Sequence, residues 1–268
     1  MKNLLFLLCT VSAAAFGQAP SQPATGPQPQ PINNATVTDS TANKFDANGN
    51  KHGLWQEQEG ALRTEGTYNH GKKEGCWKTL FYNGQINLLE EYQEGKRNGL
   101  FLELSNSGTL RKQIQYKNGT YHGTFRQFNS AGRAEQEITY RNGELSGPKK
   151  TYYANGKLLE EGAFEHNLRQ GNASWYYENG KTSVQYQYKD GELDGVQRTF
   201  SNDGFLSTET GYKKNAMDGD YREFFEDGKT LKLKGQYDKD KKTGNWLEYN
   251  KEGKVIKTER YKEDVLVK

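Results

Sequence analysis

Apolar side chains recur in this chain at three fixed positions of a period of about 24 residues. Each period begins with a glycine, here called the anchor glycine, and the nine anchors are Gly53, Gly75, Gly99, Gly123, Gly147, Gly171, Gly195, Gly219 and Gly244. An aromatic residue follows two positions later in most periods, another apolar residue follows five positions later, and the period ends with Tyr or Phe. A regular period of this length indicates a stack of like supersecondary units.

The second, third and fourth periods show the pattern most clearly. The apolar residues of the three columns there include Trp77, Phe101 and Phe125 at the second position, Phe128 at the fifth, and Tyr92, Tyr116 and Tyr140 at the end. We interpret these residues and their glycines as structural repeat positions. Like side chains on neighbouring strands would stack along the sheet and stabilise one another.

Turn residues divide each period into two short strands. A second glycine stands nine residues after the anchor in eight of nine periods, as in Gly84, Gly108 and Gly132, and Asn or Asp often precedes it. Such dipeptides tolerate positive φ and are a strong hairpin signal. Gly or Asn recurs again shortly before the next anchor, as in Gly143 and Asn167. The pattern predicts an all-β fold, an elongated antiparallel single-sheet array of about nine 24-residue β-hairpin units.

The second and fifth positions differ in parity, so in a regular strand their side chains face opposite sides of the sheet. Two arrangements remain open at this point. Either a β-bulge turns one column toward the other, or both faces of the sheet carry aromatic residues. The second arrangement would leave apolar surface available to a partner.

Composition alone would favour a disordered chain, because 32% of the residues are hydrophobic, 26% are charged and the mean hydropathy is -1.04. The repeat changes this interpretation, since the apolar content is concentrated in aromatic residues at fixed positions. One unit has too little core to fold alone, so we expect neighbouring units to stabilise each other. The formal net charge of +3 is spread along the chain and does not indicate a nucleic-acid partner.

The segment before the repeats differs in character. Residues 1–17 have the positive start, short apolar stretch and small-residue end of a secretory signal peptide. Residues 18–45 contain five of the six prolines among Gln, Ser, Thr and Asn, which predicts a disordered linker. Residues 46–268 form the predicted repeat domain. Export to the periplasm or to the cell surface or exterior is therefore the expectation.

Two segments carry a family resemblance: residues 75–95, GCWKTLFYNGQINLLEEYQEG, and residues 147–164, GPKKTYYANGKLLEEGAF. They resemble the bacterial variant of the MORN repeat, with its Gly, aromatic pair, Asn-Gly turn, Lys-Leu and terminal Tyr. The resemblance extends from about residue 46 to the end. It implies an extended antiparallel β array without a common catalytic residue. Some bacterial relatives are named as antitoxins, and other MORN proteins are linked to membranes, lipids and scaffolding. Gln58 in the first unit and Asp264 and Lys268 in the last depart from the pattern and are interpreted as end caps.

Catalytic and metal-binding motifs do not stand out. The four histidines, His52, His70, His122 and His166, lie at inter-unit turns without Asp, Glu or Cys at metal-binding intervals. No HExxH, Walker or paired-cysteine motif occurs. We therefore expect no catalytic residue, no metal and no cofactor.

The function that this pattern favours is an exported, non-enzymatic scaffold whose sheet binds another protein. An antitoxin or immunity protein that sequesters a toxin is the first alternative. A carbohydrate-binding surface protein is the second, with Tyr153, Trp175 and Tyr177 as candidate stacking rings for an envelope glycan. A membrane surface is a further candidate partner.

Overall fold

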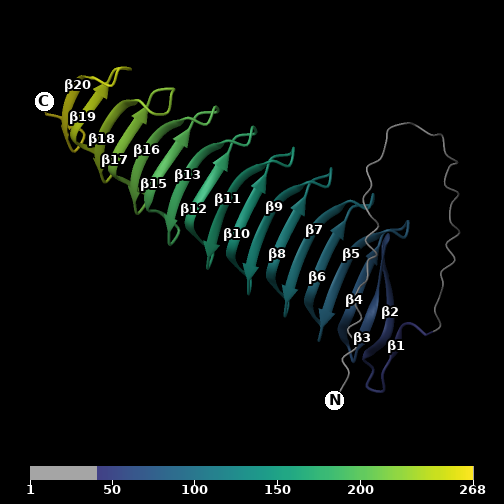
Figure 1. The fold of residues 1–268 in the computed structure, drawn as a ribbon. Coiled ribbons are helices and arrows are strands. Elements are labelled where there is room, and N and C mark those ends of the chain that lie inside the picture. Colours follow the sequence, from purple (N-terminus) through teal and green to yellow (C-terminus); the bar gives the residue numbers. More distant parts are fainter. Residues whose placement is uncertain (1–40, 268) are drawn as a thin grey trace, which may run out of the picture.

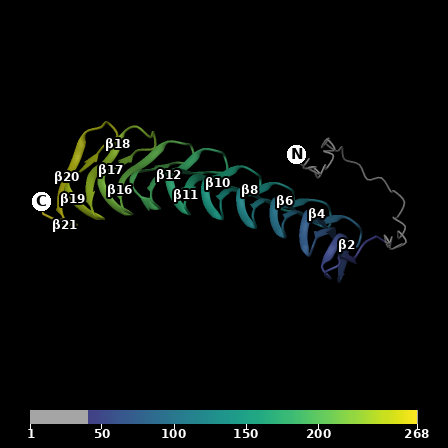
Figure 2. The same ribbon diagram turned by 90° about the horizontal axis from the view of Figure 1, so that it is seen from below.

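The computed structural model describes residues 41–267, which form a single antiparallel sheet of 21 strands. Nearly every strand pairs with the next one in the chain, so the array follows the order of the sequence and is elongated (Figures 1 and 2). The fold class is thus confirmed. The signal peptide predicted for residues 1–17 and most of the linker predicted for residues 18–45 lie outside the described residues. The predicted start of the repeat domain at residue 46 falls directly after a short first strand.

The strands are β1 (Lys44–Phe45), β2 (Lys51–Glu59), β3 (Leu62–Asn69), β4 (Lys72–Leu80), β5 (Ile86–Gln93), β6 (Lys96–Leu104), β7 (Leu110–Lys117), β8 (Thr120–Phe128), β9 (Ala134–Arg141), β10 (Glu144–Tyr152), β11 (Leu158–Glu165), β12 (Leu168–Tyr176), β13 (Thr182–Lys189), β14 (Glu192–Leu193), β15 (Gly195–Phe200), β16 (Leu206–Lys213), β17 (Ala216–Phe224), β18 (Leu231–Asp238), β19 (Lys241–Tyr249), β20 (Val255–Lys262) and β21 (Val265–Leu266). Strands β14 and β15 both pair with β13 and act as one interrupted strand. The hairpins from β2–β3 to β19–β20 are the nine units.

The two kinds of turn use different chemistry. Between units, both central residues have positive φ, as in Asn142 at 51° and Gly143 at 88°, which is the type I′ geometry of tight hairpins. Within units only the glycine does, as Gly156 at 86° shows. The expectation of positive φ for the whole Asn-Gly dipeptide is wrong there. Asn155 instead accepts a 2.9 Å hydrogen bond through its side-chain oxygen from the amide of Lys157, which closes the turn.

A β-bulge lies at the anchor glycine in most units. In β8 the pairing with β7 jumps from Tyr121 to Phe125, and Gly123 within the jump has a φ of 99°. Such a bulge leaves a backbone group without its ladder partner. The side chain of Gln115 replaces that partner, because its oxygen accepts a 3.1 Å hydrogen bond from the amide of Thr124. In the same way, Glu91 accepts a hydrogen bond from the amide of Leu100, which follows the anchor Gly99. Gln187 accepts one from the amide of Val196, which follows the anchor Gly195.

A second bulge lies near the turn within most hairpins. It bears on whether one face or both faces of the sheet carry aromatic residues. In β18, Lys232 and Leu233 both line a pocket beside Trp246, so two successive side chains share one face. The side chain at the fifth position keeps the regular alternation and lies on the opposite face. In the sixth unit this residue is Tyr176, whose hydroxyl donates a 2.5 Å hydrogen bond to Glu161. Glu161 pairs with Lys150, and both lie on the face away from the second-position column. The sheet therefore carries aromatic residues on both faces.

We call the side that carries the second-position and terminal columns the aromatic face. Its rings contact one another edge-on across strands, as Trp77 does with Tyr68 at 4.9 Å and Tyr92 at 6.4 Å between ring centroids. Trp77 is completely buried. It lies against Gly66 of the preceding unit, where a Cβ atom would come within 2.3 Å of the indole ring. Each unit thus completes its core on the strand of its neighbour.

The first edge of the array is covered. Asn43 donates its backbone amide to Leu54 at 2.9 Å, and its side-chain amide both donates to and accepts from the backbone of Gln56 at 3.0 and 2.7 Å. The Phe45 ring then packs edge-on against Trp55 at 5.1 Å between ring centroids. Strand β1 and Asn43 therefore satisfy most of the outer backbone groups of β2.

A glycine on the preceding strand faces the second-position residue in several units. It should tolerate an added methyl group only where that second-position residue is small. Gly66→Ala would place its Cβ 2.3 Å from the Trp77 ring, whereas Gly162→Ala would place it 3.1 Å from the Ala173 Cβ, and neither glycine has positive φ. We expect G66A to destabilise the protein by about 1–3 kcal/mol and G162A by less than about 1 kcal/mol. Thermal unfolding followed by circular dichroism measures both. Equal shifts in Tm would contradict this packing.

Alanine substitutions at two anchor glycines distinguish the cost of a strained backbone from the cost of steric overlap. Gly123→Ala would combine a φ of 99° with a Cβ placed 2.0 Å from the Gln115 oxygen, while Gly219→Ala has a φ of 105° and nothing within 4 Å. We expect G219A to cost about 1–2 kcal/mol from the backbone alone, and G123A to cost more. Denaturant unfolding of the two variants gives the difference. A smaller loss for G123A would show that the Gln115 hydrogen bond is not needed.

Candidate binding surface

A column of cations crosses the aromatic face two residues before the anchor glycine. In five units this position holds Lys or Arg, and in each the charged group lies 4.1–5.5 Å from the centroids of rings on its own strand and on a neighbouring strand. These cations are Lys51, Lys73, Arg97, Arg169 and Lys242. The arrangement is the geometry of a cation–π interaction. The apolar pattern of the sequence does not reveal this column, although its cations recur at a fixed position before the anchor glycine.

The second unit holds a half-buried lysine of this column, Lys73. The Lys73 ammonium lies 4.1 Å from the Trp77 ring and 4.9 Å from the Tyr92 ring, and in residues 41–267 it has no ion-pair partner within 4.0 Å. Burial lowers its pKa, although Glu90 and Glu57 favour the charged form. Lys73 is therefore a half-buried cation on the aromatic face, without a carboxylate within ion-pair distance in residues 41–267.

The third unit pairs its cation with a buried carboxylate. Glu90 is 5% exposed and accepts hydrogen bonds from the Arg97 Nε at 2.8 Å and from the Tyr92 hydroxyl at 3.3 Å. The Arg97 guanidinium also lies 5.4 Å from the Phe101 ring. Burial opposes the charge on Arg97, but the hydrogen bond with Glu90 raises its pKa above the ordinary value. The charges of this group therefore nearly cancel.

In the sixth unit Arg169 occupies the space left by a small second-position residue. Its guanidinium lies among the rings of Phe164, Trp175 and Tyr188, 5.1–5.5 Å from their centroids, and pairs with Glu160 at 2.5 Å. The buried Nη1 of Arg169 has no hydrogen-bond partner in the described part of the chain. Trp175 thus belongs to the aromatic face, at its fourth position.

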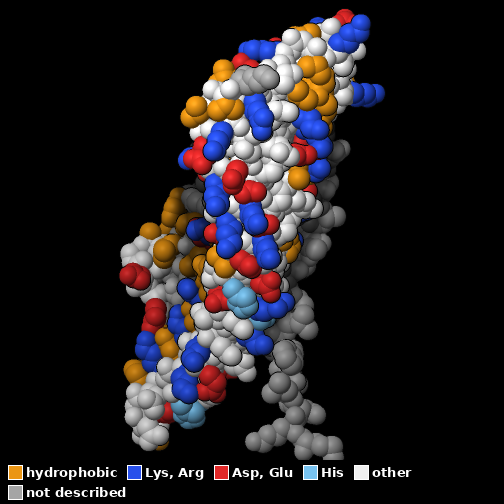
Figure 3. Space-filling model, turned by 90° about the vertical axis from the view of Figure 1, so that its left-hand side faces the viewer, with side chains coloured by type: hydrophobic (Ala, Val, Ile, Leu, Met, Phe, Trp, Pro, Cys, Tyr) orange, Lys and Arg blue, Asp and Glu red, His pale blue; other side chains and the backbone are white. Residues whose placement is uncertain are grey.

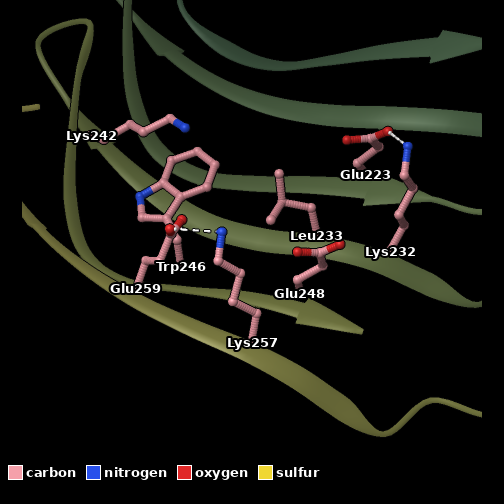
Figure 4. Close-up of a pocket in the computed structure, with 8 residues that line it drawn as sticks. All are labelled: Glu223, Lys232, Leu233, Lys242, Trp246, Glu248, Lys257 and Glu259. Carbon is pink, nitrogen blue, oxygen red and sulfur yellow. Dashed lines mark hydrogen bonds and ion pairs between the residues drawn. The ribbon is translucent and has the colours of Figure 1, made fainter. Parts of the chain in front are cut away.

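A pocket hollows the aromatic face near the last units (Figure 4). Its volume is about 320 Å³, and its lining comprises Glu223, Lys232, Leu233, Lys242, Trp246, Glu248, Lys257 and Glu259. Two ion pairs border it, Lys232–Glu223 at 2.6 Å and Lys257–Glu259 at 2.8 Å. Leu233 pairs with both Glu223 and Glu248 on the neighbouring strands.

The first units fill the corresponding positions differently. Thr64 and Thr79 stand where Leu233 and Glu248 stand, and their hydroxyls lie 3.2 Å apart in a hydrogen bond. Thr79 is buried. The aromatic face is therefore tightly packed in the first units and hollowed near the last ones.

The predicted stacking rings do not form one site. Tyr153 and Tyr177 each stand six residues after an anchor, and their hydroxyls donate 2.7 Å hydrogen bonds to the carbonyls of Tyr176 and Phe200. These bonds join each of these two units to the next one, on the side of the sheet where the turns within units lie. Trp175 lies on the aromatic face beside Tyr186, with 5.1 Å between ring centroids.

Two of the four histidines contact carboxylates from a preceding segment. The His70 ring lies 2.5 Å from a carboxylate oxygen of Asp46, and the His166 ring lies 2.7 Å from one of Glu144. The hydrogen bond with His70 is the largest of the effects that lower the pKa of Asp46. Within residues 41–267 no group of three or more His, Cys, Asp and Glu side chains could hold a metal ion.

Comparison with known families confirms the resemblance for two adjacent units. The family model described as the MORN repeat variant matches residues 145–166 and 169–190. These two units are similar to the MORN repeat variant. The matched segments cover the hairpins β10–β11 and β12–β13, and each begins two residues before its anchor glycine, Gly147 or Gly171. The other seven MORN-like hairpins have the same strand pairing and an anchor glycine with positive φ.

Other comparisons add little to this family assignment. No curated protein matches the chain. Among solved structures, a crystal structure of TcdB2-TccC3-Cdc42 is 12% identical with a TM-score of 0.17, over 74% of this chain and 14% of that chain. This chain therefore spans about a seventh of the length of that one.

The described residues also contain no helix that is long and apolar enough to cross a membrane. Charged side chains of both signs are interspersed over the face in Figure 3, with hydrophobic side chains in small groups among them. This side of the molecule therefore carries both charged and apolar side chains.

Ionisation of the terminal column should weaken the fold at alkaline pH. Burial, followed by the interaction with Tyr121, raises the pKa of Tyr116 from 10.0 to about 12. Between these values the unfolded chain releases this proton and the folded chain keeps it, so stability falls as the pH rises through the window. We expect Tyr116→Phe to make the loss of Tm between pH 10 and 12 shallower. Tyr82→Phe, at a residue 75% exposed, is the control and should leave the slope unchanged.

Proposed function

We propose that this protein is an exported, non-enzymatic scaffold that binds another protein through its aromatic face. The observation that carries the proposal is the column of cations, which places Lys or Arg over Trp, Tyr or Phe in five of nine units. Trp, Tyr and Arg are the residues that most often dominate the binding energy of protein interfaces. A repeated group of this kind supplies many similar contacts along one surface.

The electrostatics of the face favour a protein over an anionic lipid surface. Lys51 pairs with Glu57, Arg97 with Glu90 and Arg169 with Glu160, so most of the cations are neutralised. Binding to anionic lipid depends on clustered, unpaired Lys and Arg. A mixed face with paired charges and partly exposed rings instead suits a partner with its own mixed surface.

Export rests on the character of residues 1–17 and supports a partner outside the cytoplasm. The non-enzymatic role is supported by the use of the charged side chains on the aromatic face, which pair with one another or cover rings. An antitoxin role would require a toxin that the protein neutralises, and a glycan-binding role would require rings that stay free for stacking. Tyr153 and Tyr177 use their hydroxyls within the array.

Lys73 and Lys242 test the proposal because both cover rings without an ion-pair partner in residues 41–267. The tagged full chain is used for affinity purification from the envelope and exterior fractions, and bound proteins are quantified by mass spectrometry. We expect Lys73→Ser and Lys242→Ser each to reduce recovery of the specific partner partly, and the double variant to reduce it further. Repeated weak contacts give this graded loss.

The matched control carries Lys78→Ser and Lys234→Ser, which change two lysines on the opposite face. It should retain the partner, and circular dichroism should show that all variants are folded. Equal loss in the control, or complete loss from one substitution, would overturn the proposal. Capture of a glycan, or of a toxin that the chain neutralises, would support the corresponding alternative instead.

A further inference from the structure

The pocket near the last units contains one cation and one carboxylate that no neighbouring side chain neutralises. Two ion pairs at its border use four of its six charged side chains. The other two are Lys242 and Glu248, and neither makes an ion pair within 4.0 Å in residues 41–267. Both side chains are only partly exposed. Because an unpaired charge is costly to bury, each favours an oppositely charged group supplied from outside the chain.

Glu248 gives its side of the pocket an excess negative charge. Lys232 and Lys257 each donate a hydrogen bond to another glutamate, and these bonds are the largest of the effects that raise the pKa of the two lysines. The charge of Glu248 raises both pKa values further, so its carboxylate lies near both ammonium groups. Since each lysine already has its own carboxylate partner, the charge of Glu248 remains in excess.

Lys242 lies on the other side of the pocket, and apolar side chains separate it from Glu248. Its ammonium is 4.3 Å from the centroid of the Trp246 ring, while Leu233 pairs with Glu248 from the neighbouring strand. Figure 4 shows the Trp246 ring and the Leu233 side chain beside the space between the two charges. Trp246 and Glu248 are two residues apart on β19, which is about 7 Å along a strand. The two charged groups are therefore on the order of 10 Å apart.

We propose that this pocket binds a small zwitterion with an apolar body, of the size of a hydrophobic amino acid or dipeptide. The ligand carboxylate bonds to Lys242, its ammonium group bonds to Glu248, and its apolar side chains cover Trp246 and Leu233. Hydrogen bonds of about 3 Å at each end leave roughly 4 Å between the ligand charges, which one or two residues can span. The pocket volume of about 320 Å³ is at the lower end of the range for small-molecule sites.

The pocket suits a zwitterion better than a ligand with one charge. A simple anion would leave Glu248 unpaired, a simple cation would leave Lys242 unpaired, and a neutral apolar molecule would leave both. The first units do not offer the same site, although Lys73 covers a tryptophan ring there. Thr64 and Thr79 stand at the corresponding positions, and their hydroxyls are hydrogen-bonded to each other. The site is therefore a property of the last units and not of the repeat in general.

Isothermal titration calorimetry of the full chain with leucyl-leucine tests this site. We expect saturable binding with a dissociation constant on the order of 0.1–1 mM, the affinity that a good ligand of this size reaches. Leucine is titrated alongside, because the spacing of the charges admits one residue or two. N-acetylated and C-amidated leucyl-leucine each lack one charge and should bind about 5- to 30-fold more weakly. Glycylglycine keeps both charges but lacks the apolar side chains, and it should also bind more weakly.

Two substitutions assign the ligand charges to the two side chains. Glu248→Gln should weaken binding of leucyl-leucine about 5- to 30-fold and remove its advantage over the N-acetylated form, while its advantage over the amidated form remains. Lys242→Met keeps an unbranched side chain over the Trp246 ring and should give the reverse pattern, with the advantage over the amidated form lost. A purely structural effect of either substitution would weaken all the ligands alike.

The matched controls are Lys73→Met, which changes a lysine over a ring outside the pocket, and Glu178→Gln in the exposed turn after β12. Both should leave binding unchanged, and circular dichroism should show that all variants are folded. Three results would each contradict the site: no saturable binding of leucine or leucyl-leucine, equal binding of the blocked forms by the original chain, or equal weakening by a control substitution. The titration contains no other protein, so its outcome is independent of the scaffold function proposed above.

Discussion

The structure depends on one interaction, the packing of a second-position side chain against the strand of the preceding unit. Trp77 lies on Gly66 and Trp246 lies on Gly235, where in each case a Cβ atom would come within 2.3 Å of the ring. The core is therefore not enclosed within a unit but is shared across each boundary between units. A chain with 32% hydrophobic residues can fold in this way because each ring contacts two neighbours.

The same constraint produces the cation column. A single sheet has no second layer to cover its rings, so part of each ring on the aromatic face would remain open to water. A Lys or Arg two residues before the anchor glycine extends over the rings of two adjacent strands and covers them with its aliphatic stem. Where the cation is an arginine, a carboxylate such as Glu90 or Glu160 accepts its hydrogen bonds. Stabilising the fold thus gives the face the composition of a protein interface.

Much of the fold could be predicted from the sequence, because the period, the turn glycines and the aromatic columns are all local signals. The anchor Gly123 and the turn residue Gly143 have the positive φ that their spacing indicated. The use of Asn155 as a turn-closing acceptor is a side-chain contact that the dipeptide pattern does not distinguish from positive φ. The bulge that brings Lys232 and Leu233 to one face depends on strand pairing, which the alternation of one strand does not reveal.

The candidate site was less predictable for the same reason. Tyr153 and Tyr177 stand out in the sequence as rings, but their hydroxyls bond to carbonyls 23 residues further along, and only the stacking of units brings these groups together. The lysines that cover rings look like ordinary surface charges in the sequence. Their role appears only when the period is applied to polar residues as well as apolar ones.

The ends of such an array are subject to a different constraint from its interior. Every interior strand has two neighbours, so the ladders satisfy most of its backbone groups, and side chains such as Gln115 are needed only at the bulges. An end strand has one neighbour, and its sequence must either supply a substitute, as Asn43 does for Gln56, or leave the groups open. At the other end, within residues 41–267, the substitute reaches only to Arg260, and exposed valine and isoleucine side chains lie on the part of β20 before it. In the described part of the chain, the backbone groups of the outermost strands therefore depend on residues that lie outside the repeat pattern.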